Sequence, residues 1–207
     1  MKKLILRMTL SLDGFMAGPK GELAHIFRSS DEQAKQWISD HMWLGGVHIM
    51  GSRTYADMAA YWPKSTDILA ACMNEIPKVV FSRSGKAPAP SSSTQALADA
   101  KRAMPIDEKQ LASWREPRVA SGDLAQEIAR LKAEPGKDII AHGGIAFARS
   151  LVKSGLIDEY WLIVHPVALG RGEGLFTDLA KPQAFELLSS TRFPAGACAQ
   201  VLRPKQE

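Results

Sequence analysis

The hydrophobic residues of this chain fall into short runs that are typical of β-strands, and most of these runs are separated by stretches with helical spacing. Gly14 closes the first run, and a Pro-Ala-Gly break at residues 194–196 separates the last two. That break predicts a C-terminal antiparallel hairpin. The expected strands are residues 4–12, 47–50, 78–81, 138–141, 160–164, 185–193 and 198–202.

Helical periodicity is clearest at Leu124, Ile128 and Leu131, which lie at positions i, i+4 and i+7. Asp31 is a capping candidate at the start of a second helix, and Gly155 predicts the end of another. The expected helices are residues 31–43, 54–61, 67–74, 124–131 and 145–153. Strands that alternate with helices and end in a hairpin predict an α/β domain with a mixed sheet.

One segment, residues 85–118, does not fit this alternation. It begins with a Pro-, Ser- and Ala-rich stretch and continues with a weak helical pattern that contains a proline. Because it is long for a connection in a compact domain, we expect an exposed insertion. The strands on both sides look like members of one sheet, so we expect a single domain over residues 1–207.

Composition narrows the class of protein. The chain has 207 residues and a net charge of +4, with 26 Lys and Arg against 22 Asp and Glu. No dense basic run indicates a nucleic-acid or anionic membrane surface. The only cysteines, Cys72 and Cys198, form no CxxC motif, so neither a disulfide scaffold nor a metal site is expected.

Targeting signals are weak as well. Lys2 and Lys3 precede an apolar stretch, as in a signal peptide, but Arg7 and Asp13 interrupt it, which favours a first strand. No uncharged apolar run approaches the ~18 residues of a membrane span. We therefore expect a soluble, cytoplasmic protein.

Three strand-to-loop junctions carry residues that can bind phosphate. Residues 51–54, Gly-Ser-Arg-Thr, and residues 143–145, Gly-Gly-Ile, each lead from a strand into a helix. Residues 82–84, Ser-Arg-Ser, follow the strand between them. Free N–H groups at a helix start attract anions, and arginine adds a cationic fork. Taken singly, these junctions are compatible with a solvated arginine, a polar turn and close packing of a helix on the sheet. All three together favour a ligand at the carboxyl ends of the strands.

In this order, the segments resemble the dihydrofolate-reductase-like superfamily. They most closely resemble the reductase domain of the bacterial bifunctional riboflavin-biosynthesis deaminase/reductase and its stand-alone relatives. The matching sequence segments are residues 11–17, 49–55, 61–63, 78–83, 142–144, 154–159 and 165–170. They extend over most of the chain outside the insertion. The zinc signature of the deaminase half is absent from the sequence.

The resemblance implies a three-layer fold with a central, mostly parallel mixed sheet flanked by helices, and NADPH lying across the strand ends. By this resemblance, phosphates of the cofactor would be held by Gly51, Arg53 and Thr54, and its 2′-phosphate by Ser82 and Arg83. The pyrophosphate would lie over Gly143, Gly144 and Ile145. The nicotinamide end would be lined by Leu12, Phe15, Met16 and Ala17. Ser82 and Arg83 would favour NADPH over NADH.

Two carboxylates are candidates for a catalytic role, since hydride transfer to a C=N or C=O carbon also needs a proton. Asp31 lies close to the place where dihydrofolate reductases carry an acid, but it is also a good helix cap. Asp13 resembles the substrate-side aspartate of the riboflavin-type reductases, and it is equally compatible with a turn before Gly14.

The resemblance implies an NADPH-dependent oxidoreductase of a small pyrimidine- or pteridine-like substrate. Its reaction would be that of 5-amino-6-(5-phosphoribosylamino)uracil reductase. The alternatives are a dihydrofolate or other pterin reductase, and a pyridine-nucleotide-binding protein without catalysis. We also expect a homodimer, for which the strand over 160–164, with Trp161, and the C-terminal hairpin would supply an edge or face.

Overall fold

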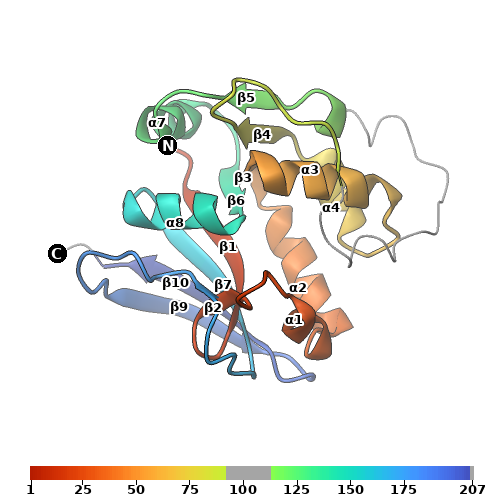
Figure 1. The fold of residues 1–207 in the computed structure, drawn as a ribbon, viewed down its shortest axis with the longest axis vertical. Helices are drawn as coiled ribbons and strands as arrows, with labels where there is room; N and C mark the ends of the chain where they lie inside the picture. Colours follow the sequence, from red (N-terminus) through yellow and green to blue (C-terminus); the bar gives the residue numbers. More distant parts are fainter. Residues whose placement is uncertain (92–112, 206–207) are drawn as a thin grey trace. The chain divides into compact units, whose positions relative to one another are not determined.

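The structure is a computed structural model that describes residues 1–91 and 113–205 (Figure 1). The chain divides into two compact units, each made from pieces that are far apart in the sequence. Unit 1 comprises Met1–Lys2 and Ile38–Ile140, and unit 2 comprises Lys3–Trp37 and Ala141–Glu207. Helix α2 (Glu32–Met42) passes from unit 2 into unit 1, and strand β6 (Asp138–His142) passes from unit 1 into unit 2.

Three parallel strands organise unit 1. Strand β4 (Lys78–Phe81) pairs with β3 (Gly45–Gly51) on one side and with β5 (Arg118–Ala120) on the other. The register sets Gly51 and Ala120 opposite Phe81, so all three strands end at the same edge. The loops that follow them therefore begin side by side.

The helices of unit 1 follow the pattern of the sequence closely. They are α3 (Ser52–Tyr61), α4 (Ala70–Glu75) and α7 (Leu124–Ala133), with a short 3₁₀ turn at Trp62–Lys64. In α7, Ile128 and Leu131 are buried, and Asp123 caps the helix by accepting a hydrogen bond from the Gln126 amide at 3.1 Å. The predicted periodicity thus identifies the buried face of this helix.

Unit 2 is built around β7 (Glu159–His165). This strand pairs in parallel with β1 (Leu4–Ser11) and antiparallel with β10 (Cys198–Pro204), and β10 pairs antiparallel with β9 (Phe185–Arg192). The other elements of the unit are β2 (Phe15–Ala17), α1 (Ala24–Arg28), α8 (Ile145–Lys153) and β8 (Glu173–Gly174). Leu4 and Leu6 of β1 are completely buried, so the first apolar run of the chain is a core strand.

The structure confirms the α/β class, the mostly parallel strands flanked by helices, and the C-terminal antiparallel hairpin. It adds β2, β5, β8 and α1, which are too short to give a periodic signal. None of the described helices combines the length and the hydrophobicity that a bilayer span requires.

The predicted insertion is only partly visible, because residues 92–112 lie outside the described part of the chain. Its two flanking strands, β4 and β5, pair directly. Contrary to the expected exposure, Trp114 near its end is only 3% exposed. The indole N–H of Trp114 donates to Asn74 Oδ1 at 2.8 Å, and its ring lies 5.8 Å from that of Tyr55, which explains the burial.

A buried lysine lies beside this tryptophan. Lys78, at the start of β4, is 3% exposed, and its Nζ lies 4.4 Å from the centre of the Trp114 ring. It donates to the Ile76 carbonyl and to Ser113 Oγ. Burial lowers the pKa of Lys78 to about 7, because the charged form is poorly solvated there.

Replacing Lys78 with methionine should therefore change how stability depends on pH. The pKa of this lysine is lower in the folded state than in the unfolded chain, so the unfolded state binds more protons between about pH 7 and pH 10. The wild type should gain stability relative to Lys78→Met as pH rises through that window, by up to ~1.4 kcal/mol per pH unit. Chemical denaturation of both proteins at several pH values measures the difference, and a pH-independent difference would contradict it.

Candidate functional site

The strand edge of unit 1 gathers five of the residues predicted to bind the cofactor. Gly51 ends β3 and is the N-cap residue of α3, so Arg53 and Thr54 lie in the first turn of that helix. Ser82 and Arg83 follow β4. Because Gly51 and Phe81 are paired, these two loops start next to each other, as the sequence predicts for loops after parallel strands.

The turn after β4 is held by its own backbone. The Ser82 amide donates to the Ala120 carbonyl at 2.9 Å, and the Gly85 amide donates back to the Ser82 carbonyl at 3.1 Å. Gly85 has a φ of +69°, which favours glycine. The Ser82 hydroxyl lies 3.0 Å from that of Ser84, while Arg83 is exposed. The turn therefore presents the exposed side chains of Arg83 and Ser84 on a fixed backbone, while Ser82 is only 7% exposed.

The starts of the longer helices fall into two kinds. Asp123 caps α7, and Asp31 caps α2 by accepting from the Ala34 amide at 2.8 Å. Helices α3 and α8 instead begin after Gly51 and Gly144, and neither has a side-chain cap. A capping carboxylate accepts hydrogen bonds from the first N–H groups of a helix, whereas a glycine has no side chain to do so, and such a helix start is a place where an anion can bind.

The diglycine junction of unit 2 lies close to β1. A Cβ atom on Gly143 would come within 3.1 Å of Met8 Cε, so a larger residue there would press on the β1 side chain. The Gly143–Gly144 peptide is cis. The Gly144 carbonyl accepts the first hydrogen bond of α8, from the Ala148 amide at 2.9 Å. The contact with Met8 supports close packing at the diglycine, and the close approach of a ligand stays a prediction.

Asp13 lies in the turn after β1 and joins it to a distant loop. Its Oδ1 accepts from the Ser11 hydroxyl at 2.6 Å and from the Leu169 amide at 3.1 Å, and its Oδ2 accepts from the Gly170 amide at 2.7 Å. The bond from Ser11 and then those from Gly170 and Leu169 lower the pKa of Asp13 to about 2. With hydrogen bonds on both oxygens, the Asp13 carboxylate holds the loop at Leu169 and Gly170 against the turn after β1.

The glycine-rich loop that follows is also held in place. Gly174 and Glu173 pair with β2, and Arg149 of α8 donates from Nε to the Gly174 carbonyl at 2.7 Å. The same guanidinium lies 3.0 Å from the Glu173 carboxylate. Gly172 packs so closely on the Ala17 carbonyl that a Cβ atom would not fit. The segment is therefore an ordered edge beside β2.

The residues predicted for the nicotinamide end separate by exposure. Leu12 is 70% exposed, whereas Met16 and Ala17 in β2 have exposures of only 3% and 2%. Phe15 is half-buried. Leu12 and Phe15 thus offer apolar surface at the end of β1, while Met16 and Ala17 can offer their backbone.

Asp31 has the geometry of a cap and a cross-link. Besides capping α2, its Oδ2 accepts from the Ala195 amide at 2.7 Å, in the turn of the β9–β10 hairpin. The amides of Ala195 and Ala34 lower its pKa. No observation supports a catalytic acid here, and that role stays a prediction.

Two other features were not anticipated from the sequence. Ser29 Oγ lies 2.6 Å from His165 Nδ1, and both residues are buried, so the end of α1 is joined to the end of β7. Ser121 follows β5 at the same edge as Ser82. The strand before Ser121 has only three residues, but the Ser-Gly-Asp sequence before a helix is a signal that could have located it.

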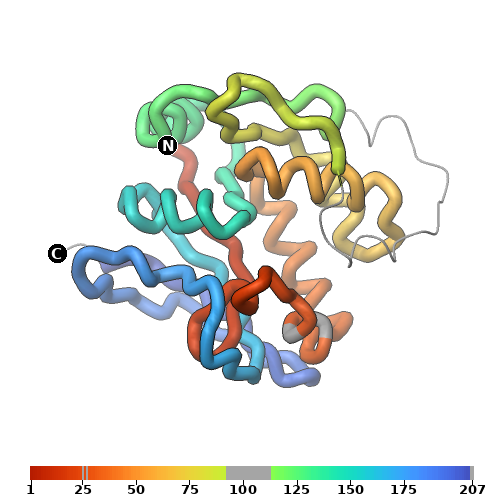
Figure 2. Tube along the Cα trace, in the orientation of Figure 1, coloured from red at the N-terminus to blue at the C-terminus, as the bar shows by residue number. Residues whose placement is uncertain are grey.

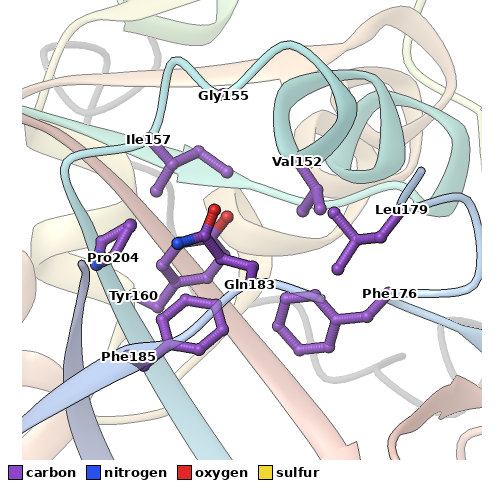
Figure 3. A pocket seen from close by; sticks show the side chains of 9 residues that line it. All are labelled: Val152, Gly155, Ile157, Tyr160, Phe176, Leu179, Gln183, Phe185 and Pro204. Carbon is purple, nitrogen blue, oxygen red and sulfur yellow. The ribbon is translucent and has the colours of Figure 1, made fainter. Parts of the chain in front are cut away.

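A small cavity lies elsewhere in unit 2 (Figure 3). Its volume is about 50 Å³, and Tyr160, Phe176 and Phe185 form one wall. It opens near the start of β7, whereas Leu12 and Asp13 follow the other end of the strand pair. A cavity of this size and place does not fit a dinucleotide. Within the described residues, no cluster of three His, Cys, Asp or Glu side chains could hold a metal ion.

Comparison with known proteins identifies a family. The model of the RibD C-terminal domain matches residues 2–199. The uncharacterized protein YyaP of Bacillus subtilis is 25% identical over 200 residues, which cover 94% of this chain and 91% of that protein.

Solved structures agree on the fold. A pyrimidine reductase-like protein from Corynebacterium diphtheriae superposes with a TM-score of 0.66 at 16% identity, covering 100% of this chain and 93% of that one. A dihydrofolate reductase from Enterococcus faecalis, complexed with NADP(H), gives a TM-score of 0.57 at 9% identity, covering 99% and 97%. The expected dihydrofolate-reductase-like fold is thereby confirmed.

The hydrogen bonds that Asp13 accepts from the Leu169 and Gly170 amides should be detectable by titration. A group whose pKa is depressed by folding stabilises the native loop above its unfolded pKa of about 3.9, and this contribution is lost as pH falls through its folded pKa. The NMR shift of the Gly170 amide should therefore titrate with a midpoint near pH 2. Asp13→Asn should abolish that titration and speed amide hydrogen exchange at Leu169 and Gly170. A midpoint near 4 would show that the carboxylate does not hold this loop.

Proposed function

The chain belongs to the RibD C-terminal domain family, and on that premise we propose that it is an NADPH-dependent reductase of a small pyrimidine substrate. The proposed reaction is of the type carried out by 5-amino-6-(5-phosphoribosylamino)uracil reductase. The likeness to a pyrimidine reductase-like protein supports the substrate class, and the likeness to a dihydrofolate reductase in complex with NADP(H) supports the cofactor. No described contact favours a pterin substrate or a protein without catalysis.

The observation that carries this proposal is the contrast between helix starts. The helices that begin after Gly51 and Gly144 have no side-chain cap, whereas α2 and α7 are capped by aspartates. The two starts without a side-chain cap are those that the resemblance assigns to cofactor phosphates. Backbone N–H groups at a helix start bind phosphate through hydrogen bonds and the helix dipole. The residues present therefore fit a dinucleotide phosphate.

Each group of residues has a separate task in this proposal. When bound, NADPH would supply a hydride to an electrophilic carbon of the substrate. In unit 1, the first turn of α3 with Arg53 would hold phosphate, and Ser82 and Arg83 would bind the 2′-phosphate. In unit 2, the start of α8 would lie under the pyrophosphate, and Leu12 would cover the nicotinamide end with apolar surface.

The two aspartates take positioning tasks. Asp13 accepts from the Leu169 and Gly170 amides, so it would set the loop on the substrate side. Asp31 would hold the hairpin turn against the start of α2 through Ala195. Aspartates are ordinarily ionised at neutral pH, and the hydrogen bonds of Asp13 and Asp31 lower their pKa values further. We therefore assign proton delivery to a different group or to water.

We also propose a cytoplasmic homodimer. NADPH is available in the cytoplasm, which supports that location. Strand β7 lies between β1 and β10 and so offers no edge for pairing. Among the described strands, β9 pairs with β10 alone, and Leu187 and Leu188 on it are 56% and 37% exposed. An exposed edge strand with apolar side chains is a surface that another copy can cover.

The cofactor proposal is tested by calorimetry with NADPH and NADH. The wild type should bind NADPH more tightly. Arg83→Ala should weaken NADPH binding roughly 10- to 100-fold, because a hydrogen bond to a charged group contributes ~1.5–3 kcal/mol. NADH affinity should hardly change, and Arg203→Ala, at an exposed arginine on β10, is the matched control. Equal affinities for the two cofactors would sink the assignment of Arg83.

The reaction itself is tested by the loss of nicotinamide absorbance when NADPH and enzyme are mixed with candidate substrates. Oxidation with the phosphoribosylaminouracil substrate and none with dihydrofolate is the expected result. NADPH oxidation with dihydrofolate and none with the phosphoribosylaminouracil substrate would instead identify the protein as a pterin reductase.

The homodimer is tested by light scattering over micromolar concentrations. The wild type should be dimeric, and Leu188→Lys should be monomeric, because a lysine on an edge strand opposes pairing. A wild type that is monomeric throughout would exclude the dimer.

A further inference from the structure

Helix α3 holds both described ends of the long segment between β4 and β5. On the outgoing side, the Ser91 amide donates to the Ala56 carbonyl at 3.1 Å. On the returning side, the Tyr55 hydroxyl donates to the Trp114 carbonyl. Two neighbouring residues of one helix thus tie down the chain where it leaves and where it returns. Figure 2 shows the outgoing stretch running back alongside α3.

The returning end is fixed by more than this one bond. Tyr55 is 2% exposed and Trp114 is 3% exposed, and their rings lie 5.8 Å apart. The Trp114 indole N–H donates to Asn74 Oδ1, and Asn74 Nδ2 donates to the Trp62 carbonyl at 3.1 Å. Buried polar groups that are all paired in this way form a rigid network, since loss of one partner leaves another unsatisfied.

The network also reaches β4. Lys78 Nζ lies over the Trp114 ring and donates to Ser113 Oγ at 3.0 Å. Ser113 in turn donates to the Asn74 carbonyl. Trp114 therefore contacts α3 through Tyr55 and β4 through Lys78. Residues proposed to bind phosphate lie in the first turn of α3 and in the turn that follows β4.

We propose that Tyr55, Ala56, Ser91 and Trp114 form a clamp that positions the proposed 2′-phosphate site, and that Trp114 is a positioning residue for cofactor selection. We name these four residues the α3 clamp. The inference rests on the proposed NADPH site and goes beyond it, because none of the four residues is assigned to the cofactor.

The clamp residues lie next to the proposed phosphate-binding residues in the sequence. Tyr55 directly follows Arg53 and Thr54 on α3. The turn with Ser82 and Arg83 is bounded by β4 on one side and by the Ser91 tether on the other. The clamp thus borders the turn that would bind the 2′-phosphate and the helix start that would hold another phosphate of the cofactor. A site held in advance binds more tightly, because less ordering remains to be done on binding.

The test uses the full chain and the variant Tyr55→Phe, which removes the hydroxyl that reaches Trp114. NADPH affinity should fall roughly threefold to tenfold, the effect of one hydrogen bond, while NADH affinity stays within twofold. The ratio of the NADPH affinity to the NADH affinity distinguishes a change at the 2′-phosphate site from a loss of folded protein, because a lower folded fraction reduces both affinities equally. Trp114→Phe is the second variant: it keeps an aromatic ring and the backbone carbonyl but removes the indole N–H that donates to Asn74, and it should also lower the ratio.

Tyr61→Phe is the matched control, since it makes the same change at the other end of α3. In the cofactor-free protein, hydrogen exchange at the Ser82 and Ser91 amides should speed up in Tyr55→Phe and not in Tyr61→Phe. An unchanged affinity ratio in Tyr55→Phe would overturn the clamp and leave the NADPH site intact. A wild type that binds neither cofactor would overturn the proposed function, and the clamp's role in it with that.

Discussion

Parallel pairing in register is the constraint on which the candidate site of unit 1 depends. When β3, β4 and β5 run side by side, their carboxyl ends coincide, and three loops that are distant in the sequence start at one edge. The glycine at the end of β3 allows α3 to begin at once, and the turn after β4 is locked by the Ala120 carbonyl of β5. The strand order thus determines which loops meet at this edge, and the side chains of those loops supply the groups that could bind a ligand.

Unit 2 is organised differently, by side-chain oxygens that accept from backbone amides. Asp13 and Asp31 hold loops as described, and Asp158 Oδ2 accepts from the Leu4 amide at 2.6 Å at the other end of β1. For Asp13 and Asp31, the same bonds favour the ionised carboxylate and lower its pKa. One geometry therefore both orders the loops and stabilises the charge on these two side chains.

Much of this fold follows from the sequence, and the exceptions have physical reasons. The core strands β1, β4 and β6 consist mainly of apolar residues, and α7 has a regular buried face, so the hydrophobic pattern identifies them. Strands β2, β5 and β8 have two or three residues and are defined by their partners. The role of Asp13 depends on amides 156 and 157 residues away, which no local pattern encodes. Trp114 was assigned to an exposed insertion because its partners, Tyr55 and Asn74, lie in other elements.

The discontinuous make-up of the two units has a consequence for biosynthesis. The chain enters unit 2 after Lys2, leaves it after Trp37 and returns after Ile140. Strand β1 leaves the ribosome before its partner β7, because β7 pairs Glu159 with Ile5 and is made more than a hundred residues later. Contacts of such high sequence separation form slowly. During translation, the nascent chain therefore carries an apolar strand without its parallel neighbour, and unit 2 can close only after synthesis has passed β7.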